Sequence, residues 1–380
     1  MTDNNHQICT RCVMDTTDPE ITFDAQGVCN HCHEFDQVTA KRWFPNEEGK
    51  RKLDVLVAQL KKEGEGKAYD CILGLSGGLD SSYLALVMKD YGLRPLVVHV
   101  DAGWNSEDAV KNINTVVDYC GFKLHTKVVD WEEVKDLQLA YLKAGVANQD
   151  VVQDHAFFAN LYHFAVDNDI RYVINGGNIA TESTFPSAWH HAAMDEISLK
   201  AIHKKYGKVA LKDYQTISFF EYYVYFPFVK KMTAVRPLNL MPYSKEIAQQ
   251  RLESIGYISY ERKHGESRFT KFFQNYYLPK KFNMDKRKPH LSSLIMSGVI
   301  TREQAVEKLN EPLYDQAELA EDKAFIAEKL SISVSELDKY IEEPGRHYTD
   351  FPNWDSRYAL LKKVQGIVAK LTGKKLNAYS

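Results

Sequence analysis

The stretch Asp70-Cys71-Ile72-Leu73-Gly74-Leu75-Ser76-Gly77-Gly78-Leu79-Asp80-Ser81-Ser82 decides how this chain folds. Its first half is a short apolar run, typical of a buried strand, and a helical pattern at residues 83–91 follows its second half. A glycine-rich turn between a buried strand and a helix is where an open α/β sheet binds phosphates. The paired glycines let the backbone approach an anion closely, and free N–H groups at the start of the helix point toward it.

The same alternation of strand and helix continues along the chain. Strands are predicted at residues 95–100, 123–129 and 171–174, with a helix at 110–119 and two further helical stretches up to residue 168. Alternating units of this length predict an α/β fold, in which a parallel sheet carries helices on both faces.

The loop itself is open to several interpretations. A Walker A loop needs Gly-Lys-Ser or Gly-Lys-Thr, and neither tripeptide occurs in the chain. Gly74-Leu75-Ser76-Gly77-Gly78 also fits the Gly-x-Ser-x-Gly nucleophile elbow of α/β-hydrolases, but that interpretation leaves Asp80-Ser81-Ser82 unexplained. A glycine turn without any ligand is the third alternative.

The string Ser-Gly-Gly-Leu-Asp-Ser-Ser resembles the signature loop of the PP-loop superfamily of ATP pyrophosphatases. The resemblance implies a fold like that of the adenine nucleotide alpha hydrolases, and cleavage of ATP to AMP and pyrophosphate. Asp80 would repel a bare phosphate, so we expect it to hold Mg²⁺ and, with Ser76, to take part in catalysis. The loop residues expected to bind the nucleotide are Ser76, Gly77, Gly78, Asp80, Ser81 and Ser82.

Later segments resemble other parts of the same superfamily. The second strand of such enzymes ends near the nucleotide, here at Asp101, and Arg236-Pro237-Leu238 and Lys245-Glu246-Ile247 resemble a late strand and helix. The fourth strand leads into Asn175-Gly176-Gly177-Asn178 and then Thr181-Glu182, which looks like a second loop in which an acidic residue helps to bind Mg·ATP. The residues expected to bind the nucleotide there are Gly176, Gly177, Thr181 and Glu182.

Four of the six cysteines form two pairs near the start of the chain, Cys9-x2-Cys12 and Cys29-x2-Cys32. Two such pairs suit one tetrahedral Zn²⁺, although a neighbouring histidine, His31 or His33, could replace one thiolate. Four protein ligands leave no open position, so we expect a structural zinc, and such a site can supply on the order of 10 kcal/mol of folding energy. A nucleic-acid-binding ribbon is less favoured because few cations lie nearby.

The bulk numbers describe an ordinary globular protein. The 380 residues carry a net charge of −3, so no global positive field indicates nucleic acid or a membrane as partner. The polar start is no signal peptide, no run of 18 apolar residues occurs, and the few cysteines indicate the cytoplasm. We expect a zinc module at residues 1–45, a PP-loop ATP pyrophosphatase domain at 50–260, and a mostly helical region at 261–380.

Enzymes of the superfamily adenylate an oxygen and then displace AMP, commonly with ammonia or sulfur. Position 2 is Thr2 rather than the cysteine of an asparagine-synthetase-type glutaminase, and neither Cys71 nor Cys120 lies in a Gly-x-Cys-x-Gly elbow. If ammonia is used, a partner protein must therefore supply it. Sulfur transfer usually requires a catalytic pair of cysteines in addition to the four expected to bind zinc. Cys71 and Cys120 are expected to be packing residues instead.

Several motifs together resemble the N-acetyl sugar amidotransferases of bacterial surface-polysaccharide biosynthesis, of the WbpG and PseA type. They are Ile8-Cys9-Thr10-Arg11-Cys12-Val13-Met14-Asp15-Thr16, Gly27-Val28-Cys29-Asn30-His31-Cys32, the glycine–serine loop, Glu266-Ser267-Arg268-Phe269-Thr270-Lys271 and His290-Leu291-Ser292-Ser293-Leu294-Ile295. The resemblance implies lipopolysaccharide or O-antigen synthesis, with the N-acetyl group of a nucleotide-linked sugar converted into an acetamidino group. It also implies ammonia from a HisH-like glutaminase, with a HisF-like companion as conduit.

Basic and aromatic residues supply further candidates. Arg268 and Lys271 share one helix face and are expected to be catalytic clamps on pyrophosphate, whereas Lys280, Lys281 and Arg287 could equally be solvated. The aromatic stretch at residues 214–228 could line a sugar site, but a core or homodimer interface is favoured. His190 or His191 could act as acid or base on ammonia.

Two other functions remain as alternatives. One is a tRNA-modifying enzyme such as a thiolase, against which the near-neutral charge speaks. The other is a non-catalytic nucleotide-binding subunit of a polysaccharide complex, which would release no pyrophosphate.

Overall fold

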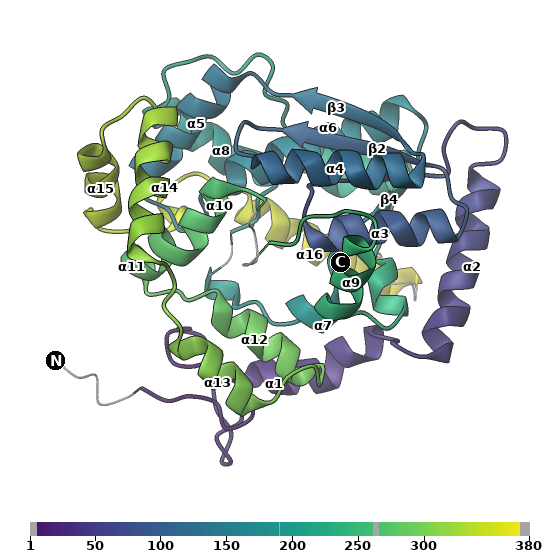
Figure 1. Ribbon diagram of the computed structural model, residues 1–380, viewed down its shortest axis with the longest axis horizontal. Coiled ribbons are helices and arrows are strands. Elements are labelled where there is room, and N and C mark those ends of the chain that lie inside the picture. Colours follow the sequence, from purple (N-terminus) through teal and green to yellow (C-terminus); the bar gives the residue numbers. More distant parts are fainter. Residues whose placement is uncertain (1–5, 190, 261–265, 373–380) are drawn as a thin grey trace.

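A parallel sheet of five strands forms the centre of the molecule (Figure 1). The computed structural model describes residues 6–189, 191–260 and 266–372, so Thr2 and His190 lie outside the described residues. The strands lie in the order β3 (Lys123–Val128), β2 (Pro95–Asp101), β1 (Cys71–Gly74), β4 (Tyr172–Ile174) and β5 (Thr233–Val235). All four neighbouring pairs are parallel.

Helices cover both faces of the sheet, as the strand–helix alternation predicts. Side chains along β1 alternate between two cores, with Cys71 and Leu73 in one and Ile72 in the other. The first core is closed by α2 (Glu47–Glu63), α3 (Leu79–Asp90), α4 (Glu107–Cys120) and α9 (Lys245–Glu253). The second is closed by α5 (Trp131–Ala144), α6 (Val151–Asp167) and α8 (Glu196–Tyr206). The predicted α/β class is therefore confirmed.

The late strand lies three residues before its predicted position. Arg236-Pro237-Leu238 leads instead into a 3-10 turn, Pro237–Leu240, and the strand is β5. Proline has no N–H to donate to a neighbouring strand, which explains why the strand ends before Pro237. The helix expected at Lys245-Glu246-Ile247 is α9, capped by Ser244.

The cysteine-rich start of the chain packs beneath the sheet, against helices from the other end of the sequence (Figure 1). It contains α1 (Asn30–Glu34), followed by a π-helical turn (Phe35–Thr39) and a 3-10 turn (Ala40–Arg42). The helices beside it are α12 (Arg287–Met296) and α13 (Arg302–Asn310). α13 begins with a capping box at Thr301.

The C-terminal region is helical and spreads over several surfaces of the molecule (Figure 1). One group shares a core with Trp104 and comprises α10 (Arg268–Phe272), α11 (Leu278–Phe282), α14 (Gln316–Lys329) and α15 (Val334–Glu342). The last helix, α16 (Asp355–Thr372), follows Trp354, whose ring packs on the aromatic π-helix Glu221–Val229. None of the helices in the described ranges is both long and apolar enough to cross a membrane.

Candidate functional site

A cavity of about 760 Å³ opens at the carboxyl ends of β1, β2 and β4. The chain leaves β1 for β2 on one side and later returns to β4 on the other, so the two neighbours of β1 diverge at this point. Open α/β sheets bind ligands in the crevice at such a switch in strand order. The volume lies in the range of small-molecule sites.

The glycine–serine loop forms one wall of this cavity. Gly77 has φ +80°, and a Cβ there would come within 2.7 Å of the Ala109 carbonyl oxygen, so only glycine fits. Ser76 and Ser81 share a hydrogen bond of 3.2 Å between their hydroxyls, and the Gly78 N–H donates to Ser76. The loop is therefore held in shape by its own side chains.

Helix α3 starts at the cavity without a side-chain cap. Its N-cap residue is Gly78, whereas α4, α5 and α9 are each capped by a serine or aspartate side chain. Leu79, Asp80 and Ser81 in its first turn line the cavity. The unsatisfied N–H groups and the positive end of the helix dipole suit an anion there.

Asp80 lies where the loops after β1 and β4 meet. Its carboxylate accepts hydrogen bonds from the Tyr243 hydroxyl and, at 3.4 Å, from the Asn178 amide. A Cβ on Gly176 would lie 3.5 Å from the Ser81 nitrogen, so the two loops approach closely. Gly176, Gly177, Thr181 and Glu182 all line the same cavity. The structure thus brings together most of the residues predicted for the nucleotide.

Three predicted residues lie differently. Ser82 is fully buried in α3, and Gly77, Ser82 and Asp101 are not among the described residues that line the cavity. Asp101 instead accepts hydrogen bonds from the Gly103 nitrogen at 2.7 Å and the Asn105 amide at 3.1 Å. Asn105, which does line the cavity, is a residue that the sequence did not single out.

Among the described residues, no histidine is hydrogen-bonded to Ser76, as the nucleophile-elbow interpretation would require. His99 on β2 lies beside the loop, and its two ring nitrogens interact with the Leu75 carbonyl at 2.9 Å and with Asn105 at 3.1 Å. Burial also lowers the pKa of His99. Ser76 meets Ser81 and Gly78 instead, so the geometry favours phosphate binding over nucleophilic attack.

The cavity lining also contains a buried carboxyl that sequence reasoning did not single out. Asp150 precedes α6, and its Oδ1 accepts hydrogen bonds from Thr270 at 3.1 Å and Gln153 at 3.2 Å. Burial first, and the neighbouring Asp154 next, raise the pKa of Asp150 to about 8. A carboxyl that titrates near neutral pH beside a cavity is a candidate acid–base group.

Arg268 and Lys271 do not serve as the predicted pyrophosphate clamps. Both pair with Asp322 of α14 at 2.6 Å, and neither is among the described residues that line the cavity. Asp322 is buried, so its negative charge requires these partners. The two cations tie α10 to α14, and we correct their assignment accordingly.

The other basic and aromatic candidates are also engaged elsewhere. Lys281 donates to the Tyr340 carbonyl at 2.7 Å, and Arg287, which does line the cavity, pairs with Asp285 at 2.8 Å. The aromatic segment packs on Trp354 and Tyr162 rather than along the cavity. His191 is buried against Asp195 at 3.0 Å and does not line the cavity either.

The four N-terminal cysteines converge on one point. Their sulfur atoms all lie within 4.8 Å of one another, and three of the distances are 3.6, 3.8 and 3.9 Å. Tetrahedral zinc with Zn–S bonds of about 2.3 Å separates its sulfurs by about 3.8 Å, so the geometry fits a metal ion. His31 and His33 pair instead with Asp18 and Asp24, which leaves Cys9, Cys12, Cys29 and Cys32 as the ligand set.

The remaining cysteines are packing residues, as predicted. Cys71 lies in β1 and Cys120 at the end of α4, and both are buried. Burial raises the pKa of Cys71 far above its usual range and that of Cys120 to about 11. Neither thiol supplies a thiolate for sulfur transfer.

Comparison with known proteins finds one family match. Residues 266–365 match the model of the family described as LPS biosynthesis protein WbpG-like, C-terminal domain. A segment of 114 residues is 34% identical to "Uncharacterized protein MJ1599" of Methanocaldococcus jannaschii, and it spans 29% of this chain and 39% of that protein. This chain is therefore similar, over residues 266–365, to the C-terminal domain of WbpG-like proteins of lipopolysaccharide synthesis.

Two solved structures show a weaker likeness. The NMN synthetase of Francisella tularensis aligns with a TM-score of 0.28 and 14% identity, over 57% of this chain and 99% of that one. The NH3-dependent NAD synthetase of Campylobacter jejuni aligns with a TM-score of 0.30 and 12% identity, over 70% of this chain and 98% of that one.

Proposed function

We propose that this protein is a cytoplasmic, ATP-dependent amidotransferase that converts the N-acetyl group of a nucleotide-linked sugar into an acetamidino group. One observation carries the proposal: the glycine–serine loop and the uncapped start of α3 open into a cavity at the switch between β1 and β4. The WbpG-like match of residues 266–365 supports a substrate from surface-polysaccharide synthesis.

In the first step, the acetamido oxygen attacks the α-phosphorus of ATP. The bond from that phosphorus to the bridging oxygen breaks, pyrophosphate leaves with the electron pair, and loss of the amide proton gives an O-adenylyl imidate. Backbone N–H groups of the loop bind the departing phosphates. Asp80 and Glu182 would hold Mg²⁺, which neutralises phosphate charge when bound.

In the second step, ammonia adds to the imidate carbon. The bond from that carbon to the AMP oxygen breaks, AMP leaves with the electron pair, and the nitrogen loses a proton. Asp150, whose pKa burial raises to about 8, is the candidate acceptor of that proton. The amidine forms, and the former acetyl oxygen departs in AMP. The site must exclude water, because hydrolysis of the imidate would only regenerate the amide.

The remaining parts of the proposal concern the metal and the partners. Zn²⁺ would be held by Cys9, Cys12, Cys29 and Cys32 as a structural ion, because four thiolates leave no open position. Ammonia would come from a HisH-like glutaminase through a HisF-like companion. A homodimer is compatible with the exposed apolar side chains of Phe220 and Phe228.

An isotope experiment tests the reaction class. Purified protein is incubated with ATP, ammonium and candidate UDP-linked acetamido sugars whose acetyl oxygen carries a heavy isotope. We expect an amidine product by mass spectrometry, pyrophosphate release, and the heavy oxygen in AMP. Formation of ADP alone would overturn the proposal, and thiolated tRNA would support the tRNA-modifying alternative instead.

A further inference from the structure

Helix α12 lies between the N-terminal segment that holds the four cysteines, here called the cysteine module (residues 6–45), and the loop that follows β4 (Figure 1). That loop carries α7 (Ile179–Glu182), whose last two residues, Thr181 and Glu182, line the cavity. The cysteine cluster and the cavity are built from segments that lie far apart in sequence. The ten-residue helix α12 contacts both the cysteine module and the loop that carries α7.

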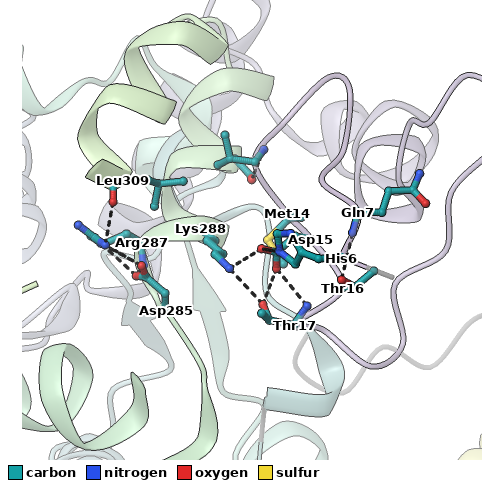
Figure 2. Close-up of polar contacts among 12 residues, drawn as sticks. His6, Gln7, Met14, Asp15, Thr16, Thr17, Asp285, Arg287, Lys288 and Leu309 are labelled. Carbon is teal, nitrogen blue, oxygen red and sulfur yellow. Dashed lines mark hydrogen bonds and ion pairs between the residues drawn. The ribbon is translucent and has the colours of Figure 1, made fainter. Parts of the chain in front are cut away.

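The first face of α12 is bound to the cysteine module. Figure 2 shows Lys288 reaching Asp15, to which it pairs at 2.5 Å, and Thr17, whose hydroxyl lies 3.4 Å away. The Val13 nitrogen donates to the Ser292 hydroxyl at 3.3 Å. Asp15 is almost fully buried, so its charge depends on the Lys288 partner.

The cysteine backbone itself is held by the helix that follows α12. Arg302, the first residue of α13, donates to the carbonyl oxygens of Cys9 and Cys12, both at 3.1 Å. The position of helices α12 and α13 is therefore linked directly to the backbone of the first cysteine pair.

The opposite face of α12 holds the loop after β4 through three hydrogen bonds. Ser293 accepts from the Thr184 nitrogen at 2.9 Å, the Ser297 hydroxyl just after the helix donates to the Ala180 carbonyl at 2.8 Å, and His290 Nδ1 meets the Thr181 carbonyl at 2.9 Å. Ser293 is fully buried, so its hydrogen bond is exposed to no competing water.

Apolar packing joins the same three parts. A single cluster contains the four cysteines, Met296 of α12 and Ile179 of α7. Since packed side chains are dense and deform little, a displaced cysteine module would shift Met296 and hence Ile179.

We propose that His290, Ser293 and Ser297 are positioning residues, through which a metal ion in the cysteine cluster sets the affinity of the nucleotide site. The metal orders the module, the module holds α12, and α12 places Thr181 and Glu182 at the cavity. This inference rests on the proposed nucleotide function of the loop. Because coupling between two sites is reciprocal, a bound nucleotide must tighten the metal by the same factor.

Because the coupling is reciprocal, it can be measured as a change in zinc affinity, without any measurement of enzymatic turnover. Zinc affinity of the whole protein is measured by competition with a chelating dye, with and without the α,β-methylene analogue of ATP and Mg²⁺. We expect the analogue to raise the apparent zinc affinity about fivefold or more, the lower end of measured couplings. Zinc removal should weaken analogue binding by the same factor, measured by calorimetry.

Two variants interrupt the route without touching either ligand. Lys288→Met removes the pair to Asp15, and Ser293→Ala removes the acceptor for Thr184. Each should bring the coupling factor toward one, whereas Lys288→Arg should retain it. Ser198→Ala is the matched control for a buried serine, because Ser198 lies in α8, away from this route.

The outcomes separate the two proposals. If the unaltered protein binds no ATP analogue, the proposed function fails. If it binds the analogue while its zinc affinity stays constant, or if Ser293→Ala leaves the coupling at its full value, the positioning role is overturned and the nucleotide function stands.

Discussion

The Tyr257 hydroxyl donates a hydrogen bond of 2.8 Å to the carbonyl oxygen of Gly77. Tyr260 donates to the same oxygen at 3.1 Å. The carbonyl of this loop residue is thus held by a segment 180 residues further along the chain. We expect the shape of the loop to depend on this support.

Tyr257→Phe should weaken ATP binding while the chemistry survives. A lost hydrogen bond of about 0.5–1.5 kcal/mol corresponds to a rise of about two- to tenfold in the KM for ATP, with kcat less affected. Pyrophosphate release at varied ATP measures both constants. Tyr340→Phe, whose hydroxyl bonds to Glu336 on α15, is the control. An unchanged KM in Tyr257→Phe would show that the loop keeps its shape without the Tyr257 hydrogen bond.

Asp80→Ala should lower the rate of AMP formation by about 100-fold or more. The site would lose the carboxylate expected to hold Mg²⁺, which neutralises the charge of the phosphates. Thermal unfolding and zinc content should stay close to those of the unaltered protein. Asp80 is hydrogen-bonded to Tyr243 and Asn178, so Tyr243→Phe serves as a control that removes one contact and keeps the carboxylate. Full activity in Asp80→Ala would refute the metal-binding role.

Arg268→Ala should destabilise the protein without changing the KM for ATP. Removal of one partner leaves the buried carboxylate of Asp322 with less compensation, which should cost only part of the roughly 3–5 kcal/mol of a fully unpaired buried charge, because Lys271 still pairs with it. Urea unfolding measures the loss of stability, and pyrophosphate release per folded molecule measures the KM. Lys271→Ala should behave alike. A large rise in KM at unchanged stability would restore the clamp role expected from the sequence.

The stability of the protein should depend on pH through Asp150. Its folded-state pKa is raised to about 8, chiefly by burial, while Asp154 raises it and Lys286 lowers it. The folded state therefore binds more protons than the unfolded state between about pH 4 and pH 8, so stability falls as pH rises through this window. The Asp150→Asn variant has no carboxyl to ionise at this position, so it lacks this loss of stability at high pH.

We accordingly expect Asp150→Asn to be more stable than the unaltered protein at pH 8, by at least about 1 kcal/mol, and to differ little near pH 4. Urea unfolding at several pH values measures the difference. Asp24→Asn, an exposed carboxyl far from the cavity, is the control, because its pKa is lowered rather than raised. If the stability advantage of Asp150→Asn over the unaltered protein became smaller as the pH rises, the prediction would be contradicted.

His31→Ala should retain one zinc ion per chain, whereas Cys32→Ser should lose most of it. The ring of His31 pairs with Asp18 at 2.7 Å, while the Cys32 sulfur lies 3.8 and 3.9 Å from its neighbours in the cluster. Elemental analysis after dialysis against a weak chelator distinguishes the two variants. Loss of zinc from His31→Ala would return a histidine to the ligand set.

The sequence predicted the central fold well because its signals are local. The apolar run before the loop and the glycines of the loop each specify backbone conformation within a few residues. The strand β5 was placed three residues late, because a three-residue strand beside Pro237 carries almost no periodic signal.

The site was predicted only in part, for a different reason. Ser76, Asp80 and Glu182 follow strand ends, and parallel strands bring their carboxyl ends to one edge whatever the surroundings. Asp150 and Asn105 have no motif, and their places at the cavity arise from how α6 and the turn after β2 pack.

The sequence by itself determined a parallel α/β sheet, a glycine–serine loop at the end of its first strand, and a four-cysteine cluster. Each of these features depends on residues that lie close together in the sequence. Only the tertiary structure decided that Arg268 and Lys271 face Asp322, and that α12 joins the cysteines to Thr181. Such pairings connect residues tens to hundreds of positions apart. They are set by which helices pack together, and no short stretch of sequence records that choice.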